Sequence, residues 1–97
     1  MIVFIKDELH AESQGSFPTL DAALVELRRR AAIPWNQAPN LCPCLCWETC
    51  HRDLVVIEYD NTVKPWKVLR RWGYLEISSE GVFWSRDFKD GRIQLRA

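Results

Sequence analysis

The sequence lacks the features of a membrane or secreted protein. None of its stretches approaches the roughly 20 consecutive apolar residues that a membrane-spanning helix needs. The first apolar run, Met1 to Ile5, is followed at once by Lys6, and it is shorter than the roughly 7–15 apolar residues of a secretory signal. We therefore expect a cytoplasmic protein whose cysteines are thiols or metal ligands rather than disulfides.

A net charge is also missing, because 13 Lys and Arg residues balance 13 Asp and Glu residues. Nucleic-acid-binding domains usually carry a basic excess, so this balance argues against a nucleic-acid partner. One local basic stretch exists, formed beside Trp66 by Lys64, Lys67, Arg70 and Arg71. We interpret it as the solvated side of a short helix.

Glycine-rich loops are absent as well. The four glycines stand singly at expected turns, which excludes a phosphate-binding loop of the usual kind. A nucleophile-elbow serine motif is missing too. What remains is the composition of an ordinary globular protein, 47% apolar over 97 residues, which predicts one domain spanning 1–97.

The clearest predicted element is a helix over about residues 20–31. Thr19 is a good N-cap, since its hydroxyl can accept a hydrogen bond from a free amide of the first turn. Glu26 and Arg30 have the spacing of a favourable ion pair on one helix face, and Pro34 ends the segment. An apolar stripe recurs at helical spacing through Leu20, Ala23, Leu24, Leu27 and Ala31.

The other regular segments are predicted to be strands, with one further helix. A short second helix is expected over about 65–72, because Pro65 suits a first turn and Gly73 suits the residue after a helix. Asp90–Gly91 is a two-residue hairpin signal. The expected strands are Met1–Lys6, a weaker Leu9–Ser16, Leu54–Tyr59, Tyr74–Ile77, Val82–Lys89 and Arg92–Leu95. Together they predict an α+β fold, in which the main helix packs on one face of a mostly antiparallel sheet of four to six strands.

Residues 33–52 form a long irregular loop in this prediction. The stretch contains three prolines, two tryptophans and all four cysteines, and it shows no regular period. A loop of this length is uncommon in a compact domain and is usually functional or packed internally.

The cysteines in this loop are candidate ligands for a soft metal such as zinc. The candidate set is Cys42, Cys44, Cys46, Cys50 and His51, with the spacing C-x-C-x-C-x3-C-H. Thiolate and imidazole are preferred zinc ligands. Structural zinc sites, however, usually offer pairs two to four residues apart from two separate segments. The alternative is that these thiols simply pack as small apolar side chains.

A cysteine nucleophile is a further alternative. Cys50 and His51 are sequence neighbours, and neighbours in an extended chain point to opposite sides. A cysteine–histidine pair would therefore use His10, or a non-adjacent combination such as His51 with Cys46. Arg52 is the local cation that could favour a reactive thiolate.

Tryptophan is unusually abundant, with five residues in a short chain. Tryptophan and arginine are enriched where proteins contact partners, and some of these rings should also fill the core. The predicted binding residues are Trp35, Trp47, Arg52 and Trp66.

Several segments resemble a group of small bacterial proteins. They are MIVFI, FPTLDAALVELRRRA and PWNQAPNLCPCLCWETC, followed by VVIEYD. Together these segments are similar to short uncharacterised bacterial proteins of the gene-cassette type and to the immunity proteins that accompany secreted toxins. The resemblance spans most of the chain, and it implies a compact α+β binding protein rather than an enzyme.

The main expectation is thus a non-enzymatic protein that binds a protein partner through loop 33–52. The alternative is a protein that binds a small ligand or zinc between loop and sheet, and a thiol-dependent enzyme is the third reading. A homodimer formed through a strand edge is compatible with each of them.

Overall fold

The computed structural model describes residues 1–85, 88–89 and 92–93. Within them the chain forms one helix and a mostly antiparallel set of strands, so the predicted α+β fold class is confirmed. In chain order the elements are β1 (Ile2–Asp7), β2 (Glu12–Phe17), α1 (Leu20–Ala31), β3 (Arg52–Asp60), β4 (Lys67–Ser78), β5 (Gly81–Trp84), β6 (Phe88–Lys89) and β7 (Arg92–Ile93).

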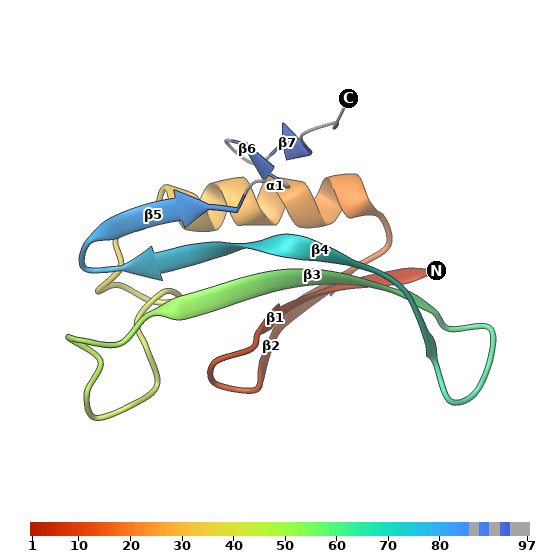
Figure 1. Cartoon of the computed structure of the whole chain (residues 1–97), viewed down its shortest axis with the longest axis horizontal. Coiled ribbons are helices and arrows are strands. Elements are labelled where there is room, and N and C mark those ends of the chain that lie inside the picture. The colour runs from red at the N-terminus through yellow and green to blue at the C-terminus, as the bar shows by residue number, and fades with distance from the viewer. Residues whose placement is uncertain (86–87, 90–91, 94–97) are drawn as a thin grey trace.

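The main sheet has five strands in the order β2-β1-β3-β4-β5, and every neighbouring pair is antiparallel. Helix α1 connects β2 at one edge to β3 in the centre by way of the long loop, and it lies along one face of the sheet (Figure 1). The described residues include no helix with both the length and the apolar character needed to cross a bilayer.

The core lies between α1 and the sheet. Alternation along the strands turns every second residue toward the helix, and these residues are fully or almost fully buried. Burial of each such Val, Leu or Ile side chain stabilises the fold by about 1.5–3 kcal/mol. The buried cluster consists of Val3, Ile5, Ala23, Leu24, Leu27, Leu54, Val56, Leu75 and Ile77.

Helix α1 begins as predicted but pairs its charges differently. The Thr19 hydroxyl accepts a hydrogen bond from the backbone amide of Ala22 at 3.1 Å. The predicted Glu26–Arg30 pair is wrong, because Glu26 accepts hydrogen bonds from Arg29 instead. Arg30 is buried, since its position falls on the apolar face of the helix.

The predicted second helix over 65–72 is wrong. Most of that segment belongs to the long strand β4, which pairs with β3 over almost its whole length. The local signals of Pro65 and Gly73 are weaker than the gain from satisfying the backbone donors and acceptors of β3. Gly73 lies inside the strand at a bulge opposite Val55 and Val56 rather than after a helix.

The last predicted hairpin can be followed only in part. Strands β6 and β7 pair antiparallel, with Lys89 opposite Arg92. The turn itself, Asp90–Gly91, lies outside the described residues, and so does Leu95, the predicted end of the last strand.

Residues 33–51, here called the cysteine loop, join α1 to β3 through a series of turns. β3 begins at Arg52, so the loop ends one residue earlier than predicted. Two buried arginines fix it: Arg30 donates from Nε to the Asn40 side-chain oxygen at 2.5 Å, and Arg52 donates from Nη2 to the Leu41 carbonyl at 2.7 Å. Both guanidinium groups also donate to the Pro39 carbonyl. The loop is therefore held by polar contacts to its backbone.

Candidate functional site

Asp7 connects the sheet to the cysteine loop. It is the last residue of β1, it lies on the same face of that strand as the core residues Val3 and Ile5, and it is 0% exposed. Burial would raise the pKa of its carboxyl, but hydrogen bonds from Arg52, at 2.9 Å, and from His10 outweigh burial and hold the pKa below its usual value. Asp7 is therefore a buried carboxylate with two cationic or polar partners.

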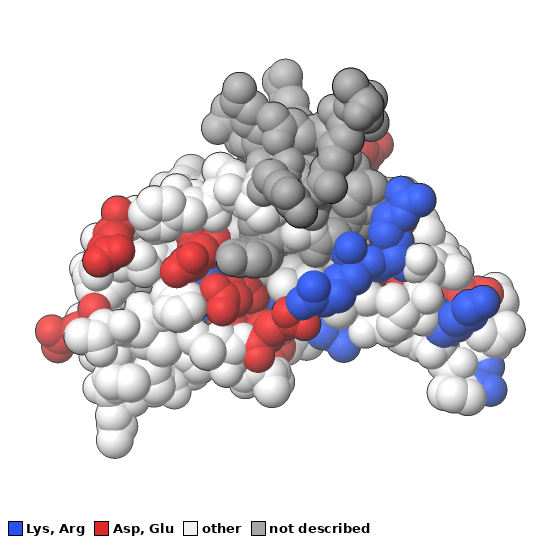
Figure 2. All heavy atoms as spheres, viewed as in Figure 1, with Lys and Arg blue, Asp and Glu red and all other residues white. Residues whose placement is uncertain are grey.

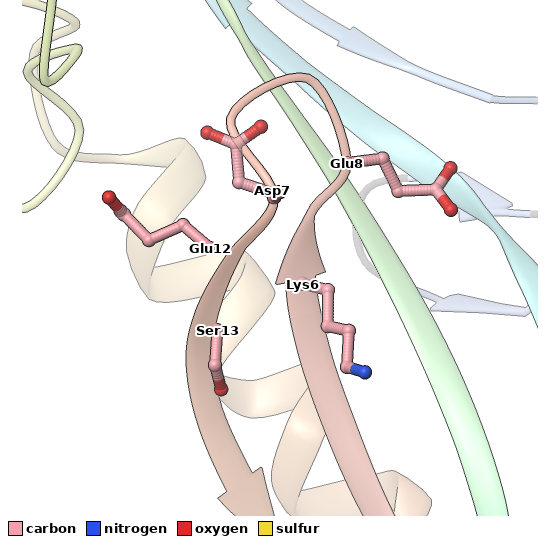
Figure 3. A pocket seen from close by; sticks show the side chains of 6 residues that line it. Lys6, Asp7, Glu8, Glu12 and Ser13 are labelled. Atoms are coloured by element: carbon pink, nitrogen blue, oxygen red, sulfur yellow. The ribbon is translucent and has the colours of Figure 1, made fainter.

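The β1–β2 turn that follows forms a pocket of about 420 Å³ (Figure 3). Asp7 and Glu12 point to one side of the hairpin, and Lys6 and Glu8 point to the other. Arg52 donates to Glu12 at 2.7 Å as well as to Asp7, so the two carboxylates on the first side are occupied by the fold. On that side the carboxylates that line the pocket already accept hydrogen bonds from Arg52, so few polar groups remain for a ligand.

His10 lies in the same turn and connects Asp7 to Cys50. Its Nδ1 lies 2.7 Å from the Asp7 Oδ2, and its Nε2 lies 3.2 Å from the Cys50 Sγ. Burial would lower the pKa of the imidazole, but the hydrogen bonds with Asp7 and Cys50 raise it above its usual value. Nδ1 donating to Asp7 leaves the Nε2 lone pair directed at the thiol in the neutral ring.

Cys50, at the end of the cysteine loop, is the centre of the cluster. Its sulfur lies 3.2 Å from the His10 Nε2 and within 4.8 Å of the Cys44 sulfur, and Cys42 is also near enough to interact with it. Burial would raise the pKa of Cys50, but interactions with Cys44, His10 and Cys42 bring it below its usual value. Burial and donation to Cys50 raise the pKa of Cys42 to about 12 and that of Cys44 to about 11.

Groups from two distant parts of the chain thus converge. The ligand atoms of His10, Cys44 and Cys50 all lie within 4.8 Å of one another, and Cys42 lies beside them, outside that group but near enough to interact with Cys50. Thiolates and an imidazole at this separation match the donor set of a four-coordinate soft-metal site. The second imidazole nitrogen bonded to a carboxylate is the usual outer arrangement of such sites.

Two of the sequence-predicted ligands fall outside the group of His10, Cys44 and Cys50, although one of them touches Cys44. Cys46 is exposed, and its sulfur lies 3.5 Å from that of Cys44. The other outlying residue, His51, faces Asp53 at 3.3 Å and Glu76 at 4.0 Å. The imidazole that meets the Cys50 sulfur is that of His10, while His51 forms a second group with Asp53 and Glu76.

The approach to Cys50 is acidic. A pocket of about 290 Å³ is lined by Cys50 and His51 together with Glu48, Glu76 and Glu80. Acidic side chains gather over the left-hand half of the face in Figure 2, the half where the β4–β5 connection lies in Figure 1, and basic ones gather over the right-hand half. The resulting field favours the approach of a cation to the cluster.

The predicted contact residues do not form one surface. Trp35 and Trp47 do meet, with ring centroids 5.6 Å apart, and both are partly exposed in the cysteine loop. Arg52 is only 4% exposed, so its guanidinium serves the fold instead of a partner surface. Trp66 is 44% exposed and lies elsewhere, packed with Phe4 and Tyr59.

The chain has no match among the protein families, the curated proteins or the solved structures with which it was compared. The function is therefore inferred from the positions of the side chains. The sequence predicted that the cysteines form a candidate site, with His10 as one possible partner of a cysteine. Asp7 gave no sequence signal of its own, because its role depends on contacts with residues more than 40 positions away.

Proposed function

We propose that this protein binds a soft divalent metal ion, zinc first of all, through Cys50, Cys42, Cys44 and His10. The single observation that supports the proposal is the convergence of the Cys50 and Cys44 sulfurs with an imidazole from another part of the chain. Cys42 is the nearby thiol that we propose as the fourth ligand. A thiol nucleophile needs only one of these neighbours, whereas a tetrahedral metal ion uses all four groups.

Each residue has a distinct part in this proposal. The three cysteines supply thiolates, and their thiol protons are released when the metal binds. His10 supplies Nε2, while Asp7 holds Nδ1 and so fixes the tautomer and the ring orientation. Arg52 anchors Asp7 and the loop carbonyls, which preorganises the site before the ion arrives.

Zinc content and cobalt substitution test this proposal. We expect the purified full chain to bind one zinc ion per molecule, and the cobalt(II) form to absorb as a tetrahedral thiolate complex. Cys50→Ser should abolish binding, and His10→Asn should weaken it by roughly 100-fold or more. The matched controls are Cys46→Ser and His51→Asn, which should bind as the wild type does. Loss of binding in His51→Asn with full binding in His10→Asn would contradict the proposed ligand set.

A second reading uses the same groups without a metal. The line Asp7–His10–Cys50 orders an acid, an imidazole and a thiol of lowered pKa, which is the arrangement of an activated nucleophile. It replaces the metal proposal if the chain takes up no zinc while Cys50 reacts with iodoacetamide faster than the more exposed Cys46.

A contact with a protein partner is compatible with metal binding. The paired rings of Trp35 and Trp47 and the fully exposed Leu45 support a docking role for the cysteine loop, of the kind expected for an immunity-type protein. We propose the product of the neighbouring gene as the partner to test. Trp47→Ala should weaken that binding by about 2 kcal/mol or more, and Trp66→Ala, in a separate aromatic cluster, is the control. Unchanged affinity in a folded Trp47→Ala variant would remove the loop from the interface.

A further inference from the structure

We propose, resting on the metal site proposed above, that Cys46 is an oxidation site. Reaction with a hydroperoxide joins Cys46 to Cys44 as a disulfide, and the metal ion then loses a ligand and leaves. The chemical class of the co-reactant is a small hydroperoxide, including hydrogen peroxide.

The number of thiols is the first observation behind this proposal. The group of His10, Cys44 and Cys50 does not include Cys46. With Cys42 as the fourth ligand proposed above, a four-coordinate ion needs no further thiol, and Cys46 is surplus. The surplus thiol is the exposed one of the four. A reagent in solution therefore meets Cys46 before it meets the buried Cys42.

The position of Cys46 is the second observation. Its sulfur lies 3.5 Å from the Cys44 sulfur, on the solvent side of the cluster. Cys44 is also one of the proposed ligands, so a bond between these two sulfurs removes a donor from the metal directly. A disulfide in so short and exposed a loop belongs to the readily reduced, regulatory kind rather than to the structural kind.

The reaction balances as a two-electron oxidation. The Cys46 thiolate attacks the outer oxygen of the hydroperoxide, the O–O bond breaks, and the alcohol, or water from hydrogen peroxide, leaves with the thiol proton. Cys46 is then a sulfenic acid. The Cys44 sulfur attacks the Cys46 sulfur, the S–S bond forms, and hydroxide leaves and takes up a proton from solvent as water. The zinc ion keeps its charge throughout and is released as Zn²⁺.

Zinc release under peroxide tests the proposal in the full-length protein. The zinc content is measured first, hydrogen peroxide is added, and release is followed with a chromogenic zinc chelator. We expect the wild type to lose zinc while a Cys44–Cys46 disulfide accumulates in non-reducing peptide maps, and a dithiol reductant to restore binding. Cys46→Ser should release zinc roughly tenfold more slowly. Leu45→Ser, an equally exposed change one residue away, should behave as the wild type.

The outcomes separate the two proposals. Equal zinc content and equal release rates in the wild type and Cys46→Ser would overturn the oxidation site and leave the metal site standing. A main disulfide that joins Cys50 to Cys42 or Cys44 would also overturn it. A wild-type chain without zinc before peroxide is added would show that the metal proposal itself has failed, and the oxidation proposal would fail with it.

Discussion

Two regions of the molecule are stabilised by different interactions: an apolar end, where α1 packs on the sheet, and a polar end around the cysteine loop. Under α1 the sheet is closed by apolar side chains such as Leu27 and Val56, which are excluded from water. Around the cysteine loop the buried polar side chains are those of Asp7, Arg30, Asn40 and Arg52, each with polar partners. Apolar contacts tolerate small adjustments, whereas buried ionic contacts are stable only when every partner is present. The second end is therefore the one where the loss of a single partner should cost most.

The largest expected effect comes from breaking the polar end. Arg52→Met leaves Asp7 buried without its cation and frees the loop carbonyls, so we expect the free energy of unfolding to fall by about 3–5 kcal/mol. Urea denaturation measures it. The double variant Arg52→Met with Asp7→Leu leaves no unpaired charge at this pair and should be more stable than Arg52→Met alone. A double variant that is less stable would contradict the ionic explanation.

Disrupting the apolar end should lower the free energy of unfolding by a similar amount, but it should not affect the proposed metal site. Leu27→Ala removes a fully buried side chain and opens a cavity, so we expect a loss of about 3 kcal/mol. The same loss should be measured with zinc and with a chelator, because the Leu27 side chain projects from α1 into the core and does not belong to the cysteine loop. A loss that depends on zinc would mean that the two ends are not independent.

Zinc itself should sharpen the contrast. At a free concentration about 100 times its dissociation constant, zinc should add about 2.7 kcal/mol to the free energy of unfolding. Hydrogen exchange should slow most in residues 33–51, and it should change less in β1 and β3. Protection confined to the strands would place the ion outside the cysteine loop.

The smallest effect is a dependence on pH in the metal-free protein. The raised pKa of His10 means that its contribution is fully present below about pH 6.5 and is lost as the pH rises through the raised value. His10→Gln should remove this slope and cost about 1 kcal/mol at the lower pH. Urea titrations in the presence of a chelator measure both. An unchanged slope in the variant would assign it to another group.

The sequence predicts the apolar end well because local patterns decide it. The helix over 20–31 has the predicted bounds, and the first hairpin and the central strand lie close to theirs. The burial of Arg30 was also readable, since it stands three residues after Leu27 on the apolar stripe. Its spacing from Glu26 instead suggested an ion pair on the helix surface.

The polar end is harder to predict because its contacts are distant in the sequence. His10 and Cys50 are 40 residues apart, and Asp7 and Arg52 are 45 apart. The error over 65–72 has the same origin, because pairing with β3 outweighs the local signals of Pro65 and Gly73. The periodicity of apolar residues along the sequence predicts which side chains are buried, but it does not predict which polar groups contact one another.

Asp7 accepts from the loop's anchor, Arg52, and from the metal's proposed ligand, His10, on one carboxylate. A bound ion that fixes the His10 imidazole would therefore also act, through Asp7 and Arg52, on the cysteine loop that carries Trp47. If a bound ion changes the affinity of that loop for a partner, then by thermodynamic reciprocity the partner changes the affinity for the ion by the same factor. Binding of a partner and binding of the metal ion would then be thermodynamically linked.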